Sequence, residues 1–241
     1  DHQVLTTGLL ALLLGTPPRT LQQRLATLTA LGVVERFRPH QPVGAGSAPY
    51  HYLLGETGAT ILVADGHPKG PGWDRARLLW LTHANGRLTH LLAVNALLAQ
   101  LTHAARHEPG TRLVCWWPAR RCHTRWGRLI SPDAYARWQD PDGEVDFFLH
   151  HTPTPATDRP VVLLEGYNDL AAATGITTPV LLHAGDPDRE TQLRDQLAGQ
   201  RLLVPVATSN PACGPPTQAV WLPASSPAGG PRYRLDALGH P

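Results

Sequence analysis

The chain has 241 residues, of which 42% are hydrophobic and 17% are charged, and its formal net charge is +2. This length suits one large domain or two small ones, with enough apolar residues for a core. The apolar segment Leu5–Leu14 is too short to span a bilayer and has no basic region before it, so we expect neither a membrane span nor a signal peptide.

A pair of helices is predicted near the start of the chain. Residues 6–14 are apolar and favour a helix, and Gly15 provides a turn before a second helix over residues 16–32. In the second helix Thr16 is suited to cap the first turn, where prolines are tolerated. Its leucines recur every three or four residues and predict one buried stripe, made of Leu21, Leu25, Leu28 and Leu31. Gly32 is expected in the left-handed conformation that ends helices.

The polar residues of this second helix lie off the stripe: Arg19, Gln22, Gln23, Arg24 and Thr27. Two β-rich runs follow, at residues 33–38 and 50–54, and residues 39–49 between them are rich in glycine and proline. The sequence therefore predicts a basic helix followed by a β-hairpin. This order is typical of a winged helix-turn-helix that binds DNA, although an ordinary helix and hairpin within a core would give the same pattern.

The distribution of charge favours the DNA-binding interpretation. Residues 1–54 carry four arginines against Asp1 and Glu35, a net charge of +2, whereas the other residues carry 17 basic and 17 acidic side chains. We expect Arg19, Gln22 and Gln23 to face base edges and Arg24, Arg36 and Arg38 to contact phosphates. The tip at residues 44–47, with Gly46 and Ser47, is expected along the backbone or the minor groove.

Later segments alternate between helix and strand and predict an α/β domain with a mixed sheet. Helices are expected at 56–64, 88–105, 160–174 and 188–197, and strands at 111–117, 130–138, 144–151, 179–183 and 201–207. The predicted organisation is a winged helix over 1–64, a linker over 65–87, an α/β domain over 88–208 and a loosely ordered Pro/Gly-rich tail over 209–241. Because little chain precedes residue 6, we expect the first helix of the winged domain to be missing.

The chain resembles the replication-relaxation family. The residues that carry this resemblance are Leu5–Thr7, Arg36–Pro39, Gly46–Tyr52, His90–Asn95, Ser131–Tyr135, Phe147–Leu149 and Gly166–Tyr167. The resemblance implies a mixed α/β protein: an N-terminal winged helix-turn-helix followed by a restriction-endonuclease-like domain with a mixed sheet. It also implies a role in plasmid replication, in mobilisation or in their regulation. Partners would be double-stranded DNA, with a homodimer or replication and mobilisation proteins as further possibilities.

A nuclease of this kind needs paired carboxylates that hold Mg²⁺. Asp133 matches the first carboxylate of similar proteins, but His150 and Thr152 stand where the next strand is usually acidic. We therefore expect a nuclease-like domain that has no catalysis of its own, no metal site and no cofactor. Two alternatives stay open: a Mg²⁺-dependent endonuclease that uses Asp133 with Glu144, Asp146 or Glu165, and a protein-interaction module.

Other polar clusters have weaker implications. His150 and His151 are candidates for a transition-metal site with Asp133, but adjacent strand residues point to opposite faces, so only one of the two can reach it. His103 and His107 lie one helical turn apart but lack a third ligand at a diagnostic spacing. Arg120, Arg121, Arg125 and Arg128 form a second basic cluster, either a phosphate-binding surface or a solvated hairpin. The odd count of three cysteines favours a reducing, cytoplasmic environment.

Overall fold

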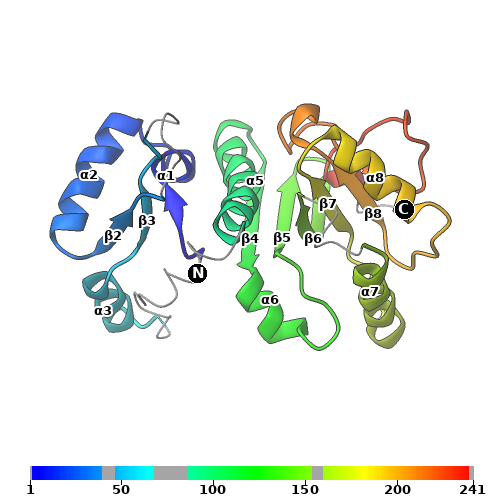
Figure 1. Cartoon of the computed structure of the whole chain (residues 1–241), viewed down its shortest axis with the longest axis horizontal. Helices are drawn as coiled ribbons and strands as arrows, with labels where there is room; N and C mark the ends of the chain where they lie inside the picture. Colours follow the sequence, from blue (N-terminus) through cyan, green and yellow to red (C-terminus); the bar gives the residue numbers. More distant parts are fainter. Residues whose placement is uncertain (1, 40–46, 68–85, 154–159, 239–241) are drawn as a thin grey trace. The chain divides into compact units, whose positions relative to one another are not determined.

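The structure, a computed structural model, describes residues 2–39, 47–67, 86–153 and 160–238. The chain divides into two compact units, residues 1–99 and 100–241. As predicted, the fold is mixed α/β: the described residues form seven α-helices and two sheets (Figure 1). The boundary between the units falls inside helix α5 (Arg87–His107), whereas the sequence placed the start of the second domain at residue 88.

The first unit contains the helices and the hairpin that the sequence predicts, in the predicted order, and also a short strand, β1, that was not predicted. Its elements are β1 (Leu5–Thr6), α1 (Thr7–Leu14), α2 (Pro18–Ala30), β2 (Val34–Phe37), β3 (His51–Leu54) and α3 (Glu56–Ala64), followed by the start of α5. The three strands form an antiparallel sheet in the order β1-β3-β2. Leu21 and Leu25 of α2 pack with Tyr52 of β3 in a small core, which joins the helix pair to the hairpin.

Two details of α2 differ from the prediction. Thr16 does not cap the helix, because Pro17 occupies the N-cap position and the Thr16 hydroxyl instead donates to the carbonyl of Leu14 at 3.5 Å. The helix ends at Ala30, so Leu31 falls beyond the buried stripe and is 61% exposed. Gly32 has φ of +68°, the left-handed conformation expected after a helix.

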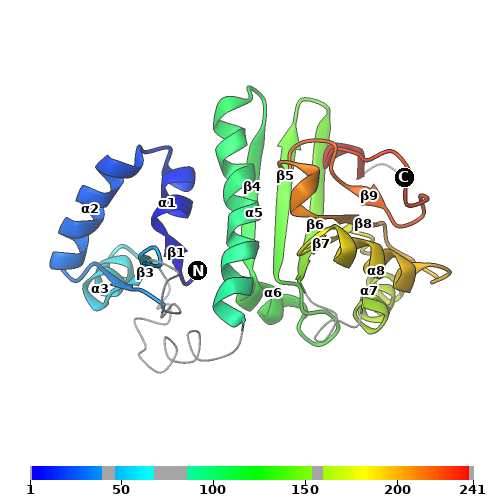
Figure 2. The ribbon, with the colours of Figure 1, turned by 45° about the horizontal axis from the view of Figure 1, so that its top comes forward.

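The second unit is built on a six-stranded mixed sheet (Figure 2). Its strands are β4 (Arg112–Pro118), β5 (Ala134–Asp140), β6 (Gly143–Thr152), β7 (Val180–Ala184), β8 (Val206–Ser209) and β9 (Leu222–Pro223). They lie in sequence order; β6, β7 and β8 are parallel, and the other neighbours are antiparallel. Its helices are the remainder of α5, α6 (Ala119–Trp126), α7 (Pro160–Thr174) and α8 (Pro187–Leu197), with short 3₁₀ turns at Pro211–Cys213 and Asp236–Leu238.

Helices α7 and α8 lie side by side and cover one face of this sheet (Figures 1 and 2). Tyr167 of α7 bonds to His150 of β6, and Glu190 of α8 bonds to Thr208 of β8. His150 and Thr208 flank Leu182 in one row across the parallel strands, so they point to the same face. Cys115, Cys122 and Cys213 are free thiols.

Two expectations for this unit are wrong. The strand β8 begins at Val206 rather than at residue 201. The segment after Ser209 is not loosely ordered, because it supplies β9 and the fully buried Trp221. Its apolar residues are few, but Val220, Trp221, Leu222 and Leu235 are buried. The segment between β4 and β5 forms the helix α6, which excludes the solvated hairpin considered for its arginines. Within the described part of the chain, none of the helices has the length and apolarity needed to cross a membrane.

Candidate nucleic-acid interface

Helix α2 presents a polar face to solvent. Arg19, Gln22 and Gln23 are exposed and occupy positions i, i+3 and i+4, which share one side of a helix. That side is opposite the buried Leu21 and Leu25. Ala26 and Ala30 are also exposed, and such small side chains leave room for close approach of another molecule. Arg24 is exposed as well, but it lies on a different side of the helix from these three residues. The structure therefore places all four predicted α2 residues on the surface. The three that are expected to face bases, Arg19, Gln22 and Gln23, share one side of the helix.

The hairpin carries two arginines on one face of β2. Arg36 and Arg38 are two residues apart, so their side chains point the same way, whereas Phe37 between them points to the other face. Both guanidinium groups stack on the ring of Tyr50: the Cζ atom lies 4.3 Å from the ring centroid for Arg36 and 3.8 Å for Arg38. Such cation–π contacts hold the guanidinium groups in place while leaving them exposed.

The hairpin arginines lie on the side of the sheet that α2 packs against. Arg36 pairs in register with Tyr52, and Tyr52 packs on Leu21 and Leu25 of α2. Arg38 also donates to the hydroxyl of the exposed Ser47, at 3.0 Å. Ser47 is thus held by Arg38. The other residues of the expected tip, residues 44–46 with Gly46, lie outside the described residues.

The second unit contains the position that matches a nuclease carboxylate. Asp133 immediately precedes β5, and its carboxylate accepts the backbone N–H of His151 at 2.9 Å. Its own backbone N–H donates to the carbonyl of Leu149 at 3.0 Å. Asp133 thus links the start of β5 to the end of β6.

His150 and Thr152 stand where a nuclease would supply acidic partners. The Nε2 atom of His150 shares a hydrogen bond of 2.7 Å with the hydroxyl of Tyr167, and both residues are buried. Burial, aided by the charge of Asp133, holds the pKa of Tyr167 well above its ordinary value. The hydroxyl of Thr152 donates to the carbonyl of His183 at 3.4 Å. These side chains form hydrogen bonds in the interior and provide no second carboxylate.

The replacement acids considered from the sequence do not gather around Asp133. Asp146 forms a two-point ion pair with Arg137, at 2.5 and 2.9 Å, and Glu144 lies 3.4 Å from the same guanidinium group. Asp146 is five residues from His151 along β6, roughly 16 Å at strand spacing. Glu165 is exposed on α7. Among the described residues, a group of three potential metal ligands within 4.8 Å occurs at Asp140, Asp142 and Asp236, away from Asp133.

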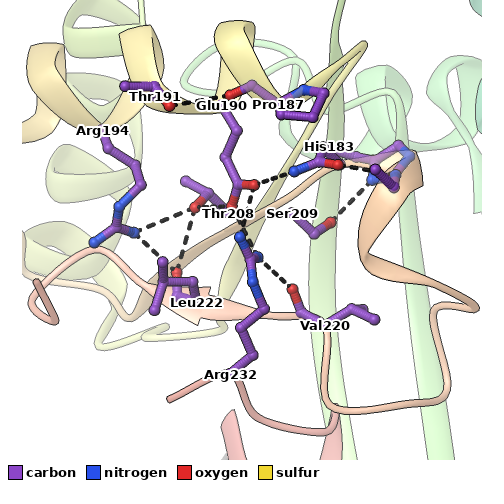
Figure 3. Close-up of polar contacts among 12 residues, drawn as sticks. His183, Pro187, Glu190, Thr191, Arg194, Thr208, Ser209, Val220, Leu222 and Arg232 are labelled. Carbon is purple, nitrogen blue, oxygen red and sulfur yellow. Dashed lines mark hydrogen bonds and ion pairs between the residues drawn. The ribbon is translucent and has the colours of Figure 1, made fainter. Parts of the chain in front are cut away.

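A buried polar cluster that the sequence did not reveal lies beneath α8 (Figure 3). Glu190 is 3% exposed and accepts two hydrogen bonds from Arg232, at 3.0 and 2.9 Å, besides bonds from Thr208 and Asn210. Burial alone would raise the pKa of Glu190, but these donors and the charge of Arg232 together hold it below its ordinary value. Glu190 and Arg232 are far apart in the sequence, so no local pattern indicates their pairing.

A histidine pair lies at the carboxyl ends of the parallel strands. His183 pairs in register with His151 on one side and with Ser209 on the other. Its Nδ1 atom shares a hydrogen bond of 2.9 Å with the Ser209 hydroxyl. Burial, together with the neighbouring His151, lowers the pKa of His183 to about 4, so this imidazole is neutral at pH 7. His183 therefore adds no positive charge to the second unit at that pH.

A family model described as replication-relaxation matches residues 1–181. The chain belongs to the replication-relaxation family. The match spans α2, the hairpin and the sheet as far as β7, and it confirms the resemblance found in the sequence. Membership of the replication-relaxation family supports a replication-related role for the chain. Neither the curated proteins nor the solved structures gave a match.

Proposed function

We propose that the first unit is a winged helix-turn-helix that binds double-stranded DNA, and that the chain acts through this binding rather than through catalysis. The observation that carries the proposal is the exposed polar face of α2 together with the exposed Arg36 and Arg38, which are held on Tyr50 on the side of the hairpin that packs against α2. A helix of this kind can enter the major groove while the hairpin contacts the flanking backbone.

The two kinds of side chain on this surface suit different parts of the duplex. Gln22 and Gln23 can pair with adenine edges, and Arg19 can pair with guanine, because these side chains offer matched donors and acceptors. Arg24, Arg36 and Arg38 supply positive charge for phosphates, which positions a protein on DNA without reading its sequence. The winged unit would thus combine sequence reading by α2 with anchoring by the hairpin.

The second unit supports a role without nuclease activity. Asp133 is engaged in backbone hydrogen bonding, and its expected acidic partners are replaced by His150 and Thr152. A Mg²⁺ ion needs several oxygen ligands, which the described residues around Asp133 do not provide. We propose that this nuclease-like unit serves as a scaffold. By family membership, the DNA target would belong to a replicon, and the process would be plasmid replication, mobilisation or their regulation.

Replacement of Gln22 and Gln23 by alanine tests the sequence-reading role of α2. Duplexes bound by the wild-type chain are selected from a random pool, and affinities for the selected and scrambled duplexes are then measured. We expect Gln22→Ala/Gln23→Ala to lose roughly tenfold or more of the preference for the selected duplex, because each good base contact contributes about 1–3 kcal/mol of discrimination. Affinity for scrambled DNA should change little.

Thr60→Ala is the matched control, since Thr60 is an exposed polar residue on α3 of the same unit. It should leave the preference unchanged. An unaltered preference in the glutamine variant, or an equal loss in the control, would contradict the assignment of base reading to α2.

A further inference from the structure

Helix α6 exposes a set of arginines in the second unit. It connects β4 to β5 and lies at one end of these strands in both views (Figures 1 and 2). Cys122 is fully buried and Trp126 is partly buried, and together they fix the inner side of the helix. Four exposed arginines lie on or directly after it, and we call them the α6 arginine patch: Arg120, Arg121, Arg125 and Arg128. On the helix itself, these side chains point away from the buried side.

This patch has no acidic counterpart in the sequence around it. Residues 109–132 contain five arginines and neither aspartate nor glutamate. Within the described part of the chain, none of the four patch arginines forms an ion pair. The contact made by Arg121 is with the ring of Trp117, 4.2 Å from its Cζ atom. Positive charge is therefore concentrated here, although the residues after 54 are neutral as a whole.

The arginines also oppose the stability of their own helix. Arg121 and Arg125 are four residues apart, where like charges repel each other. Arg120 and Arg121 occupy the first turn, at the positive end of the helix dipole, and this turn has no acidic residue. A sequence selected only for the stability of α6 would avoid both arrangements. Such conflicts between local preference and observed sequence are expected at functional sites, where a bound anion would relieve them.

We propose that the α6 arginine patch is a second DNA-binding surface, which holds the phosphate backbone of a duplex without reading bases. Guanidinium groups donate paired hydrogen bonds to phosphate oxygens, and the stacking of Arg121 on Trp117 fixes one of them in advance. The choice of duplex DNA over other polyanions rests on the function proposed above. With this patch, each of the two units has a DNA-binding surface of its own: α2 and the hairpin in the first unit, and α6 in the second.

The test is the salt dependence of DNA binding by the full chain with Arg120→Gln, Arg121→Gln and Arg125→Gln together. Each lost phosphate contact lowers the slope of log K against log salt by about 0.9, so the slope should fall by about 2 to 3. The affinity at 0.1 M salt should fall at least tenfold, equally for selected and scrambled duplexes. The control variant, Arg112→Gln/Arg201→Gln/Arg234→Gln, removes three exposed charges elsewhere in the same unit and should change neither slope nor affinity.

A lysine version of the three α6 substitutions separates charge from folding. It keeps the positive charges, so it should retain most of the slope. An unchanged slope in the folded glutamine variant, or an equal loss in the control variant, would overturn the proposal. The same series is repeated with Arg36→Gln/Arg38→Gln already present. If the hairpin substitutions alone have no effect but the α6 substitutions still weaken DNA binding, the result supports the α6 surface and contradicts the role proposed for the hairpin.

Discussion

Substitution of Arg232 by alanine is expected to lower the free energy of unfolding of the second unit by about 3–5 kcal/mol, because it leaves a buried charge without its partner. The carboxylate of Glu190 is 3% exposed and receives two hydrogen bonds from Arg232. Thr208 and Asn210 would remain as donors, but neither carries a charge. Thermal and denaturant unfolding of the full chain, followed by tryptophan fluorescence, measure the loss.

Acid should reduce this difference between the variant and the wild type. In the folded wild type, the pKa of Glu190 lies below its ordinary value of 4.5. Its charge therefore contributes stability above pH 4.5, and this contribution is lost as the pH falls through the lower, folded-state pKa. Since a protonated Glu190 no longer needs a cation, Arg232→Ala should cost much less in acid than at pH 7.

The matched control is Arg234→Ala. Arg234 is two residues away, its side chain is 45% exposed and its guanidinium lies 3.7 Å from Asp236. Because the Arg234 side chain is 45% exposed, its ion pair with Asp236 is only partly buried, and this control should lose much less stability than Arg232→Ala. Equal effects of the two substitutions would show that the Glu190–Arg232 contact does not anchor the C-terminal segment.

Replacement of Arg19, Arg24, Arg36 and Arg38 by glutamine is expected to weaken duplex binding by a factor on the order of a thousand at 0.1 M salt. All four side chains are exposed, and none of them lies in the core. If each contacts a phosphate or a guanine, the slope of log K against log salt should fall by about 3 to 4. Anisotropy of a labelled duplex, measured across a salt series, gives both quantities.

Measuring the four substitutions as two pairs shows whether α2 or the hairpin accounts for the loss of DNA affinity. Arg36→Gln/Arg38→Gln removes the arginines stacked on Tyr50 and should weaken selected and scrambled duplexes alike. Arg19→Gln/Arg24→Gln should also reduce the preference for the selected duplex, because Arg19 shares its face with the glutamines. The pair Arg112→Gln/Arg201→Gln is the control with equal loss of charge. A normal slope in the four-arginine variant would exclude this surface from DNA binding.

The elements of the first unit were predictable because their patterns are local. Leucine spacing identified α2, and the glycine- and proline-rich segment between two β-rich runs identified the hairpin. The end of α2 was harder to place, since Leu31 continues the leucine spacing but follows the last helical residue, Ala30. Thr16 has the right residue type for a cap, yet Pro17 takes that position. Residue type and periodicity alone did not fix these ends.

The elements missed in the second unit depend on contacts between distant segments. Helix α6 is short, and its inner side is marked only by Cys122 and Trp126, so the sequence shows no clear helical stripe there. The segment after Ser209 has a composition typical of disorder, but Trp221 and Leu222 complete the sheet edge. The Glu190–Arg232 pair likewise joins α8 to a segment 42 residues later. Such pairings carry no periodic signal in the sequence.

Photo-crosslinking from α2 tests the central claim most directly. A photoreactive phenylalanine derivative replaces Gln23 in one variant and Thr60 in another, and each full chain is irradiated with a duplex selected by the wild type. Gln23 lies on the face assigned to the major groove, whereas Thr60 lies on α3 and hydrogen-bonds to the carbonyl of Glu56. We expect a crosslink to bases of the selected duplex from position 23 and little from position 60. Efficient crosslinking from position 60 without any from position 23 would contradict the DNA-binding surface proposed for the first unit.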